Sequence, residues 1–195
     1  MKYNRHLPII IFLILLLGIT SCESEYSKLV HKEMANGIRN DSLVFNIKFG
    51  DSKKDFFNRC WQLNKEGLVS QGPNNKYVQH ILKTPKQGKS NINMLFYGIF
   101  DRENKITGMD LLFSYTGWSP WNKKLTATNL VPALKDSLET WYPGNPFIAL
   151  TLKETAEEAF IKVDGNRQIT IYARDTKDVV VKMEDLRKKY ASKFK

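Results

Sequence analysis

Two amphipathic helical segments, each followed by a series of strand-like runs, dominate the pattern of this chain. The first helical segment begins near Ser52, and the second ends at Pro143 and Gly144. The strand-like runs cover 76–84, 92–101 and 105–115 after the first segment, and 147–153, 159–163, 167–173 and 179–183 after the second. Short runs separated by turn residues favour antiparallel pairing between neighbours. The sequence therefore predicts the α+β class, with an antiparallel sheet and helices on one face.

The two series share their order of elements, which predicts two helix-plus-meander halves at residues 50–115 and 126–183. Their residues show no convincing identity, so only the order of elements suggests a duplication. Ser52 and Asp55 at the start of the first helical segment have the spacing of a capping box. Gly67 is expected to end that helix.

Local signals also predict structure outside the two helical segments. A short helix near the N-terminus is expected to be capped by Ser27 and ended by Gly37. Residues 41–50 alternate apolar with polar or smaller side chains, which predicts an extended segment that enters the core. Asp164 followed by Gly165 is the strongest tight-hairpin signal in the chain.

The N-terminal residues have the composition of a targeting segment rather than of a folded domain. Lys2 and Arg5 precede an apolar run over residues 7–17, which is too short for a comfortable membrane-spanning helix. A charged region followed by such a run is typical of a signal peptide. We therefore expect residues 1–21 to be a cleaved signal peptide.

A cysteine follows this segment directly. Ile19-Thr20-Ser21-Cys22 resembles the lipobox of bacterial lipoproteins, in which the cysteine receives a diacylglycerol group. That chemistry needs a sulfur nucleophile, and two or three acyl chains anchor a protein stably. We therefore expect Cys22 to be lipidated. The alternative is an ordinary signal peptide, after which Cys22 pairs with Cys60 in a disulfide.

Acidic residues come directly after the cysteine, at Glu23 and Glu25. They predict an acidic, lipidated linker over residues 22–27, followed by a single domain at 28–195. The stretch resembles, in a weak form, the acidic stretch that lipoproteins of Bacteroidota on the outer face of the outer membrane often carry, and the alternative is a solvated polar linker. We therefore expect an outer-membrane location, with the periplasmic face and the cell surface both left open.

The charge of the chain bears on its partners. The formal charge of +10 falls by two when Lys2 and Arg5 leave with the signal peptide. On a lipid-anchored envelope protein, a basic surface suits an anionic lipid, an acidic glycan or an envelope protein better than nucleic acid. The plain alternative is a soluble surface with no charged partner.

The motifs that usually indicate catalysis or metal binding are missing from the sequence. His31 and His80 lack metal-ligand spacing, and no Cys-x-x-Cys, His-Glu-x-x-His, Gly-x-Ser-x-Gly or phosphate-binding glycine loop occurs. Cys60 lies on the apolar face of a predicted helix, where we expect a buried, unreactive thiol. The sequence therefore predicts no catalytic residue, no metal and no cofactor.

The stretch between the two predicted halves contains candidate binding residues. In YTGWSPWNKKL, two tryptophans flank a proline and two lysines follow. Aromatic rings in a stiff loop can stack on sugars or enter a headgroup layer, and cations beside them can pair with phosphate or carboxylate. The alternative is a lid that completes the core. The candidate contact residues are Trp118, Trp121, Lys123 and Lys124.

Two stretches resemble known lipoproteins. FGDSKKDFFNRCWQLNKEGLV and VDGNRQITIY are similar to sequences of uncharacterised lipoproteins of Bacteroidota, over nearly the full length of the chain. Gly50, Ser52, Lys53 and Asp55 also resemble the helix openings of the small lipoprotein of the barrel-assembly machinery and of the β-lactamase inhibitor protein. The helix-plus-meander units of those proteins bind other proteins. This chain lacks the Gly-x-Pro that often ends their helix.

The sequence therefore predicts an outer-membrane lipoprotein that acts as a non-enzymatic binding or scaffold module in the cell envelope. The alternative is an enzyme that acts on envelope glycan or lipid, with carboxylates that only the fold brings together. Two facing acids with raised pKa values in a cleft would support that alternative.

Overall fold

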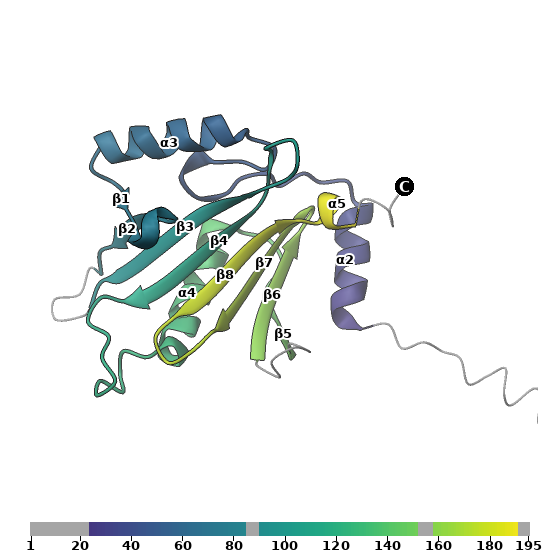
Figure 1. Ribbon diagram of the computed structural model, residues 1–195. Helices are drawn as coiled ribbons and strands as arrows, with labels where there is room; N and C mark the ends of the chain where they lie inside the picture. Colours follow the sequence, from purple (N-terminus) through teal and green to yellow (C-terminus); the bar gives the residue numbers. More distant parts are fainter. Residues whose placement is uncertain (1–23, 85–89, 152–157, 191–195) are drawn as a thin grey trace, which may run out of the picture.

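The computed structural model describes residues 24–84, 90–151 and 158–190, and its centre is an eight-stranded antiparallel sheet (Figure 1). The strands lie in the order β1-β2-β3-β4-β8-β7-β6-β5. Their bounds are β1 Ser70–Gln71, β2 Val78–Leu82, β3 Ile92–Phe100, β4 Ile106–Tyr115, β5 Ile148–Thr151, β6 Glu158–Asp164, β7 Arg167–Ala173 and β8 Val179–Asp185. The helices are α2 Glu25–Ala35, α3 Lys53–Lys65, α4 Ala127–Trp141 and α5 Leu186–Lys189, with 3₁₀ turns η1 Val44–Asn46 and η2 Pro73–Asn75. The predicted α+β class with an antiparallel sheet is confirmed.

The sheet consists of two series of strands that meet at its centre. α3 precedes β1 to β4, and α4 precedes β5 to β8. The last strands of the two series, β4 and β8, pair with each other from Gly108↔Glu184 to Phe113↔Val179. Backbone hydrogen bonds therefore join both series into one continuous sheet.

The two long helices, α3 and α4, cover the same face of the sheet. Alternate strand residues point to this face and form one core with the buried side chains of both helices. The burial of such apolar surface contributes about 25 cal/mol per Å², and it holds both helices against the strands. The largest core side chains include Phe56 and Leu63 of α3, Leu134 and Leu138 of α4, and Phe96 and Phe113 of the sheet.

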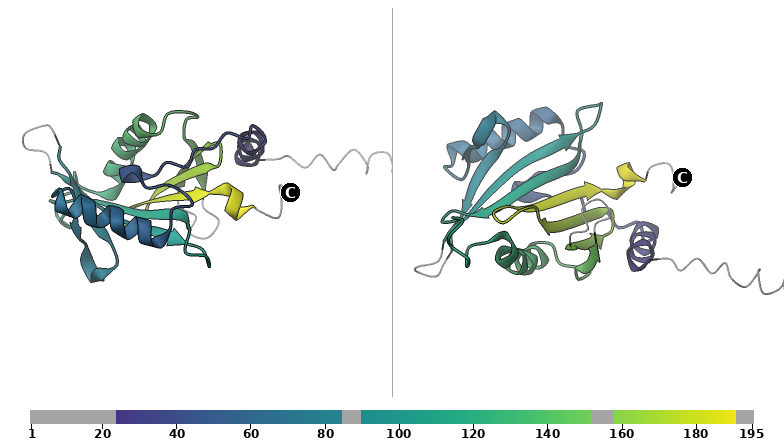
Figure 2. Two further views of the ribbon diagram at one scale, coloured as in Figure 1. Left: turned by 90° about the horizontal axis from the view of Figure 1, so that it is seen from above. Right: turned by 60° about the horizontal axis from the view of Figure 1, so that its bottom comes forward.

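α2 departs from this arrangement and lies against the opposite face, beside β6 (Figure 2). Val30 of α2 forms a second buried cluster with Ile161, Val163 and Leu186. Ile161 and Val163 alternate along β6 with Phe160, which packs against the main core. β6 therefore carries apolar side chains on both faces, and the second face needs a cover of its own.

The helix ends follow the local signals closely. The Ser52 hydroxyl accepts a hydrogen bond from the N–H of Asp55, and the Asp55 carboxylate accepts one from the N–H of Ser52, so the predicted capping box is confirmed. Gly67 follows α3 with φ +69, a conformation that glycine adopts without a Cβ penalty. The cap of α2 is Ser24 rather than the predicted Ser27. The Ser24 hydroxyl accepts a hydrogen bond from the N–H of Ser27.

All the predicted strand runs contain or overlap a strand, and β1 is a short addition that the sequence did not predict. The hairpin signal at Asp164 and Gly165 joins β6 to β7, as expected. Because Asp164 pairs with Arg167, the two loop residues are Gly165 and Asn166. The predicted hairpin is confirmed, with the loop one residue later than the signal itself.

Residues 41–50 do not form the extended segment that their alternation predicts. Ser42 forms a bridge with Lys48, and the turn η1 lies between them. Phe45 and Asn46 have φ values of 57 and 62, in the left-handed region. The alternation thus identified the buried positions but not the path of the backbone, and the prediction of extended structure is wrong. The buried apolar residues are Leu43, Ile47 and Phe49.

Candidate functional site

The connection between β4 and α4 carries the four residues that the sequence singles out. Its backbone is held by local hydrogen bonds: the N–H of Asn122 donates to the carbonyl of Ser119 at 3.0 Å, and the N–H of Leu125 donates to the carbonyl of Asn122 at 3.1 Å. The side-chain amide of Asn129 in α4 donates to the carbonyl of Lys123 at 3.0 Å. The loop therefore presents its side chains from a defined backbone.

Trp118 packs against the turn between β7 and β8. Its indole Nε1–H donates to the carbonyl of Thr176 at 3.2 Å, and the Lys177 ammonium lies 5.6 Å from its ring centroid. The residue is only partly exposed. For Trp118, these contacts agree with the packing alternative that the sequence left open.

Trp121 has the opposite environment. It is 89 % exposed, the highest value among the large hydrophobic residues that the structure describes. Lys123 and Lys124 beside it are exposed as well. Covering an indole removes roughly 150–250 Å² of surface from water, at about 25 cal/mol per Å². The loop therefore combines an uncovered aromatic ring with two cations.

Cys22 lies outside the described residues, so its lipidation stays a prediction. Within the part that the structure describes, no helix combines the length and the apolar composition that a membrane crossing requires.

Cys60 is a residue of α3 and lies on the buried side of this helix, and burial raises the pKa of its thiol to about 11. The prediction of a buried thiol is confirmed, and this thiol is protonated at neutral pH. Phe57 and Trp61, by contrast, are exposed on the outer side of α3.

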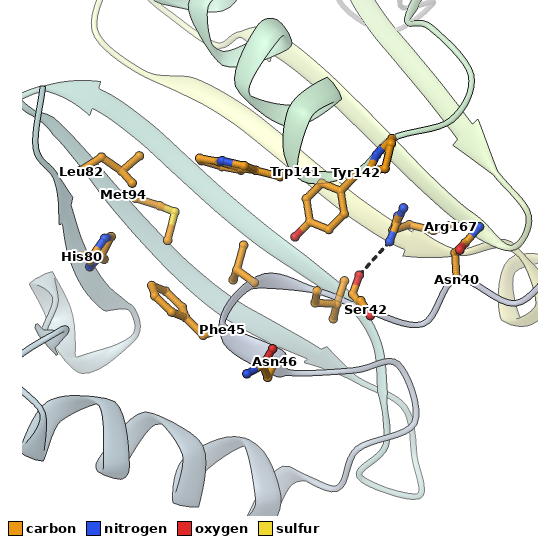
Figure 3. Close-up of a pocket in the computed structure, with 13 residues that line it drawn as sticks. Asn40, Ser42, Phe45, Asn46, His80, Leu82, Met94, Trp141, Tyr142 and Arg167 are labelled. Carbon is orange, nitrogen blue, oxygen red and sulfur yellow. Dashed lines mark hydrogen bonds between the residues drawn. The ribbon is translucent and has the colours of Figure 1, made fainter. Parts of the chain in front are cut away.

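A cavity of about 520 Å³ lies on the face of the sheet that α3 and α4 cover (Figure 3). Its walls come from residues 40–46, from β2 and β3, and from the end of α4. Most small-molecule sites have volumes of roughly 300–1,000 Å³. Apolar and aromatic walls are formed by Phe45, Leu82, Met94, Trp141 and Tyr142, and Arg167 lies at one end.

The guanidinium of Arg167 is buried at that end, with its side chain only 6 % exposed. It lies over the Tyr142 ring, 4.4 Å from the centroid, and one terminal nitrogen donates to the carbonyl of Ser42 at 3.1 Å. The other terminal nitrogen is 3.9 Å from the Asp164 carboxylate. Nε has no hydrogen-bond partner within the described ranges. Burial lowers the pKa of Arg167, while Tyr142 and Asp164 act to raise it.

Asp164 is shared with a second buried cation. The ammonium of Lys162, whose side chain is 1 % exposed, lies 2.9 Å from the Asp164 carboxylate and also donates to the carbonyl of Asn145. The same carboxylate accepts a hydrogen bond from the N–H of Asn145 at 2.7 Å. Because Lys162 is the closer partner, Arg167 is the less neutralised of the two buried cations.

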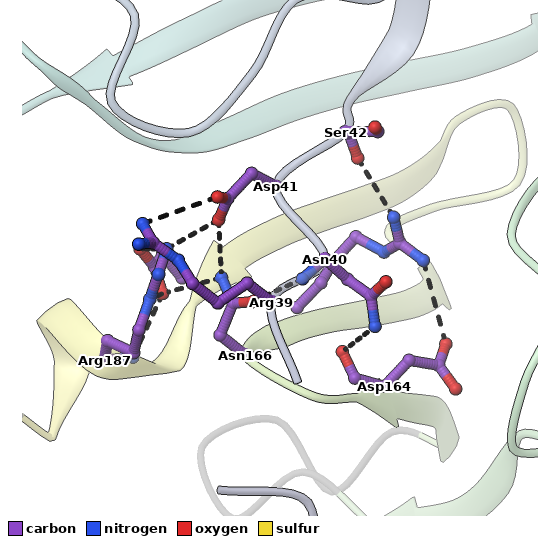
Figure 4. Close-up of polar contacts among 9 residues, drawn as sticks. Arg39, Asn40, Asp41, Ser42, Asp164, Asn166 and Arg187 are labelled. Carbon is purple, nitrogen blue, oxygen red and sulfur yellow. Dashed lines mark hydrogen bonds and ion pairs between the residues drawn. The ribbon is translucent and has the colours of Figure 1, made fainter. Parts of the chain in front are cut away.

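The turn between β6 and β7 holds this end of the cavity in place (Figure 4). The N–H of Asn40 donates to the side-chain oxygen of Asn166 at 2.7 Å, and the side-chain amide of Asn40 donates to the carbonyl of Asp164 at 3.0 Å. The Asn166 amide donates to Asp41 at 3.1 Å, and Asp41 forms an ion pair of 2.6 Å with Arg187. The segment after α2 is therefore fixed to the second series of strands.

Phe45 forms the opposite wall in a strained conformation. A non-glycine residue in the left-handed region costs roughly 1–2 kcal/mol and persists where its surroundings enforce it. The Nε of Arg59 donates to the carbonyl of Phe45 at 2.9 Å, and the Phe45 ring meets His80 edge to face at 5.1 Å. His80 Nδ1 lies 2.6 Å from the carbonyl of Leu68. Because a carbonyl only accepts, we assign a proton to Nδ1 of His80.

The described residues contain no observation that favours the enzyme alternative. In this part of the chain, no group of three or more His, Cys, Asp and Glu side chains is arranged to hold a metal. The described carboxyl groups with a shifted pKa all have it lowered, because hydrogen bonds from backbone and side-chain donors outweigh burial; they are Glu33, Asp55, Asp101 and Asp175. A general acid would need a raised pKa.

Reasoning from the sequence missed the cavity and the Arg167 cluster. The lining residues come from segments far apart in the sequence, and nothing in their spacing links them. Two signals were nevertheless present. The hairpin Val-Asp-Gly-Asn-Arg places polar residues in a strand pair that reads as buried, and Asn46 is a residue type that tolerates the left-handed conformation.

Comparison with known proteins adds little to this picture. No family model matches the chain, and no curated protein matches it. Among solved structures it is similar to a DUF4309 family protein (YjgB) from Bacillus subtilis subsp. subtilis str. 168, at 15 % identity and a TM-score of 0.34, over 80 % of this chain and 93 % of that one. A similarity this distant bears on neither the activity nor the partners of the chain.

Proposed function

We propose that this protein is a lipid-anchored lipoprotein of the outer membrane and acts as a non-enzymatic binding module in the cell envelope. In this proposal Trp121 contacts the partner, and Lys123 and Lys124 add charge beside it. The observation that carries the proposal is the 89 % exposure of Trp121 on a loop whose backbone is held by hydrogen bonds.

A partner that binds this loop gains apolar contact at a low cost in conformational entropy. A partner that covers Trp121 gains its apolar surface, and tryptophan is enriched among the residues that dominate interface energies. Because the backbone of the loop is already ordered, binding loses less conformational entropy than it would with a flexible loop. The two lysines favour a partner that presents acidic or other electronegative groups.

The proposed anchor indicates which partner the loop meets. Cys22 stands three residues before Glu25, where α2 begins, and three extended residues span about 10 Å. A lipid on Cys22 would therefore keep the start of α2 near the bilayer. The loop after β4 lies beyond the ends of β3 and β4, and β8, β7 and β6 stand between it and α2 (Figure 1). This separation along the sheet leaves the loop open to an envelope protein or a glycan.

Partner recovery after affinity purification from native envelopes tests the contact. Trp121→Ala is expected to abolish recovery and to leave the melting temperature unchanged. Trp61→Ala is the matched control, because Trp61 is also well exposed, at 60 %, but lies on α3. Undiminished recovery with Trp121→Ala would remove the basis of the proposal.

The anchor is tested separately. Intact-mass analysis of the mature protein from its native host is expected to show a diacylglycerol or triacyl modification on Cys22, and Cys22→Ser is expected to release the protein from the membrane fraction. An unmodified mass, or membrane retention of the Cys22→Ser variant, would contradict the anchor.

A further inference from the structure

The cavity at Arg167 is independent of the Trp121 loop, since none of its lining residues lies between residues 116 and 126. It combines two kinds of surface. One end is polar and carries Arg167 and the Tyr142 hydroxyl, while the rest is lined mainly by apolar and aromatic side chains. A ligand that suits both surfaces has an anionic head and an apolar body.

Arg167 has unused donors at the polar end. A guanidinium has five N–H donors, and within the described part of the chain Arg167 makes one hydrogen bond, to the carbonyl of Ser42. Its nearest carboxylate, on Asp164, lies 3.9 Å away and is held more closely by Lys162. Buried charged groups in proteins are normally paired and hydrogen-bonded. A ligand oxygen anion would supply the missing acceptors.

Tyr142 prepares the same end for an anion. Its ring lies against the guanidinium and restricts the orientation of Arg167. Its hydroxyl points into the cavity in Figure 3. Burial raises the pKa of Tyr142 to about 12, although Arg167 acts to lower it. The phenol therefore keeps its proton at neutral pH and can donate to an anionic oxygen.

The rest of the cavity offers apolar walls to an apolar chain. Met94 and Leu82 form the strand side of the cavity, Phe45 forms one wall, and Trp141 from the end of α4 lies across from it. Trp141 is 43 % exposed, so this wall reaches the surface and offers a route of entry. The volume of about 520 Å³ lies within the range of small-ligand sites.

We propose that this cavity binds a monocarboxylic acid with an apolar chain, such as a medium-chain fatty acid. The carboxylate pairs with the Arg167 guanidinium at the end of the cavity and accepts a hydrogen bond from Tyr142. The chain extends along Met94 and Leu82. Arginine and carboxylate match in geometry as well as in charge, because the guanidinium presents paired N–H groups to the two carboxylate oxygens.

Calorimetric titration of the full-length protein carrying Cys22→Ser tests the head group. Decanoate is expected to bind at least about tenfold more tightly than decan-1-ol, because the alcohol keeps the chain and loses the charge. Equal affinity for decan-1-ol would overturn the proposal. Tighter binding of decyl phosphate than of decanoate would also overturn it, in favour of a phosphate ligand.

The methyl group of Met94 reports binding inside the cavity. Its NMR signal is expected to shift when decanoate is added, because Met94 lines the cavity. Met183 is the matched control, since it is buried in the same core and is not among the lining residues. Shifts at Met183 with none at Met94 would place the ligand elsewhere and contradict the proposal.

Two variants separate binding from folding. Arg167→Gln is expected to weaken decanoate binding at least about tenfold. If that variant fails to fold, Leu82→Trp fills the apolar part and leaves Arg167, Asp164 and Lys162 intact. It is expected to abolish decanoate binding.

Trp61→Ala is the control for both variants and is expected to bind decanoate like the wild type. Unchanged affinity in folded Arg167→Gln or in Leu82→Trp would overturn the proposal. A short apolar peptide with a free C-terminus serves as a competitor. If it displaces decanoate when the peptide is present at a lower concentration than decanoate, the proposal would be overturned in favour of peptide capture.

Discussion

The turn between β3 and β4 and the turn between β6 and β7 are both short, but they are stabilised by different parts of the chain. In the first turn, the Asp101 carboxylate accepts hydrogen bonds from the N–H groups of Glu103 and Lys105, each at 2.9 Å. The carbonyl of Asn104 accepts another from Lys53 at the start of α3. These bonds join residues of the same half, and the other half adds an exposed ion pair of 3.4 Å between Lys188 and Asp101. The first turn therefore depends mainly on its own half of the chain.

The second turn depends on residues far away in the sequence. The N–H of Gly165 donates to the buried carboxylate of Glu33 in α2 at 2.8 Å, and Asn166 binds both Asn40 and Asp41. The N-terminal segment therefore acts as a structural part of the second half. A local turn can be altered with local effects, whereas a change in the second turn should affect the whole molecule.

The largest expected effect comes from Asp164→Ala. The substitution leaves Lys162 and Arg167 buried without their carboxylate, which is expected to cost about 3–5 kcal/mol in the free energy of unfolding. Urea denaturation measures the loss. Asp101→Ala, in the local turn, is expected to cost much less. Equal losses for the two variants would contradict the difference between the turns.

A smaller effect is expected from Gly165→Ala. A Cβ at this position would lie 2.3 Å from the backbone carbonyl oxygen of Ile38, and the residue has φ +56. We expect a loss of about 2 kcal/mol or more in the free energy of unfolding. Gly67→Ala is the matched control, because φ is +69 and nothing lies within 4 Å, and it should lose only about 1 kcal/mol. If the two glycines respond alike, the close approach at Gly165 has no energetic consequence.

The two loop tryptophans should differ in the same measurement. Trp118→Ala removes a packed ring and the hydrogen bond to Thr176, and we expect a loss of about 1–2 kcal/mol. Trp121→Ala should change the free energy of unfolding by no more than about 0.5 kcal/mol. A large loss with Trp121→Ala would show that this ring packs in solution, and it would argue against a role in binding.

The smallest expected effect concerns acid stability. Burial acts to raise the pKa of Glu33. Hydrogen bonds from the Gly165 N–H and from the side chains of Asn145 and Asn36 act to lower it, and together they outweigh burial, so the net shift is downward from 4.5. A lowered pKa in the folded state stabilises the fold above the unfolded pKa, and this contribution is lost as pH falls through the folded value.

Glu33→Gln should therefore flatten the fall in the free energy of unfolding below about pH 4.5, measured by urea denaturation from pH 6 to pH 3. Asp101→Asn applies the same test to the local turn, since hydrogen bonds from the N–H groups of Lys105 and Glu103 lower the pKa of Asp101. An acid limb as steep as that of the wild type in both variants would refute these pKa assignments.

The elements that could be predicted from the sequence are those with local causes. Ser52 and Asp55 form the capping box because both partners lie within one turn of the same helix. Alternating apolar residues give the strands because the period of two is a property of the strand itself. Gly67 ends α3, and Pro143 with Gly144 follows α4, because each has an intrinsic backbone preference.

The features that could not be predicted have tertiary causes. Phe45 takes a left-handed backbone conformation, which a phenylalanine disfavours. A residue of another element, Arg59 of α3, donates a hydrogen bond to the Phe45 carbonyl. Lys162 is buried against Asp164 and the carbonyl of Asn145. Arg167 is buried against Asp164 and Ser42 of the segment after α2. Trp118 and Trp121 lie three positions apart in one loop, and the contacts of Trp118 with Thr176 and Lys177 distinguish them. Spacing along the chain encodes none of these contacts.

Site-specific photo-crosslinking in intact cells tests the central claim, contact through Trp121, most directly. A photoreactive phenylalanine derivative would replace Trp121 in one strain and Trp61 in another, followed by mass spectrometry of the crosslinked products. The account predicts a discrete, reproducible product from position 121 and none shared with position 61. No product from position 121, or the same products from both positions, would contradict it.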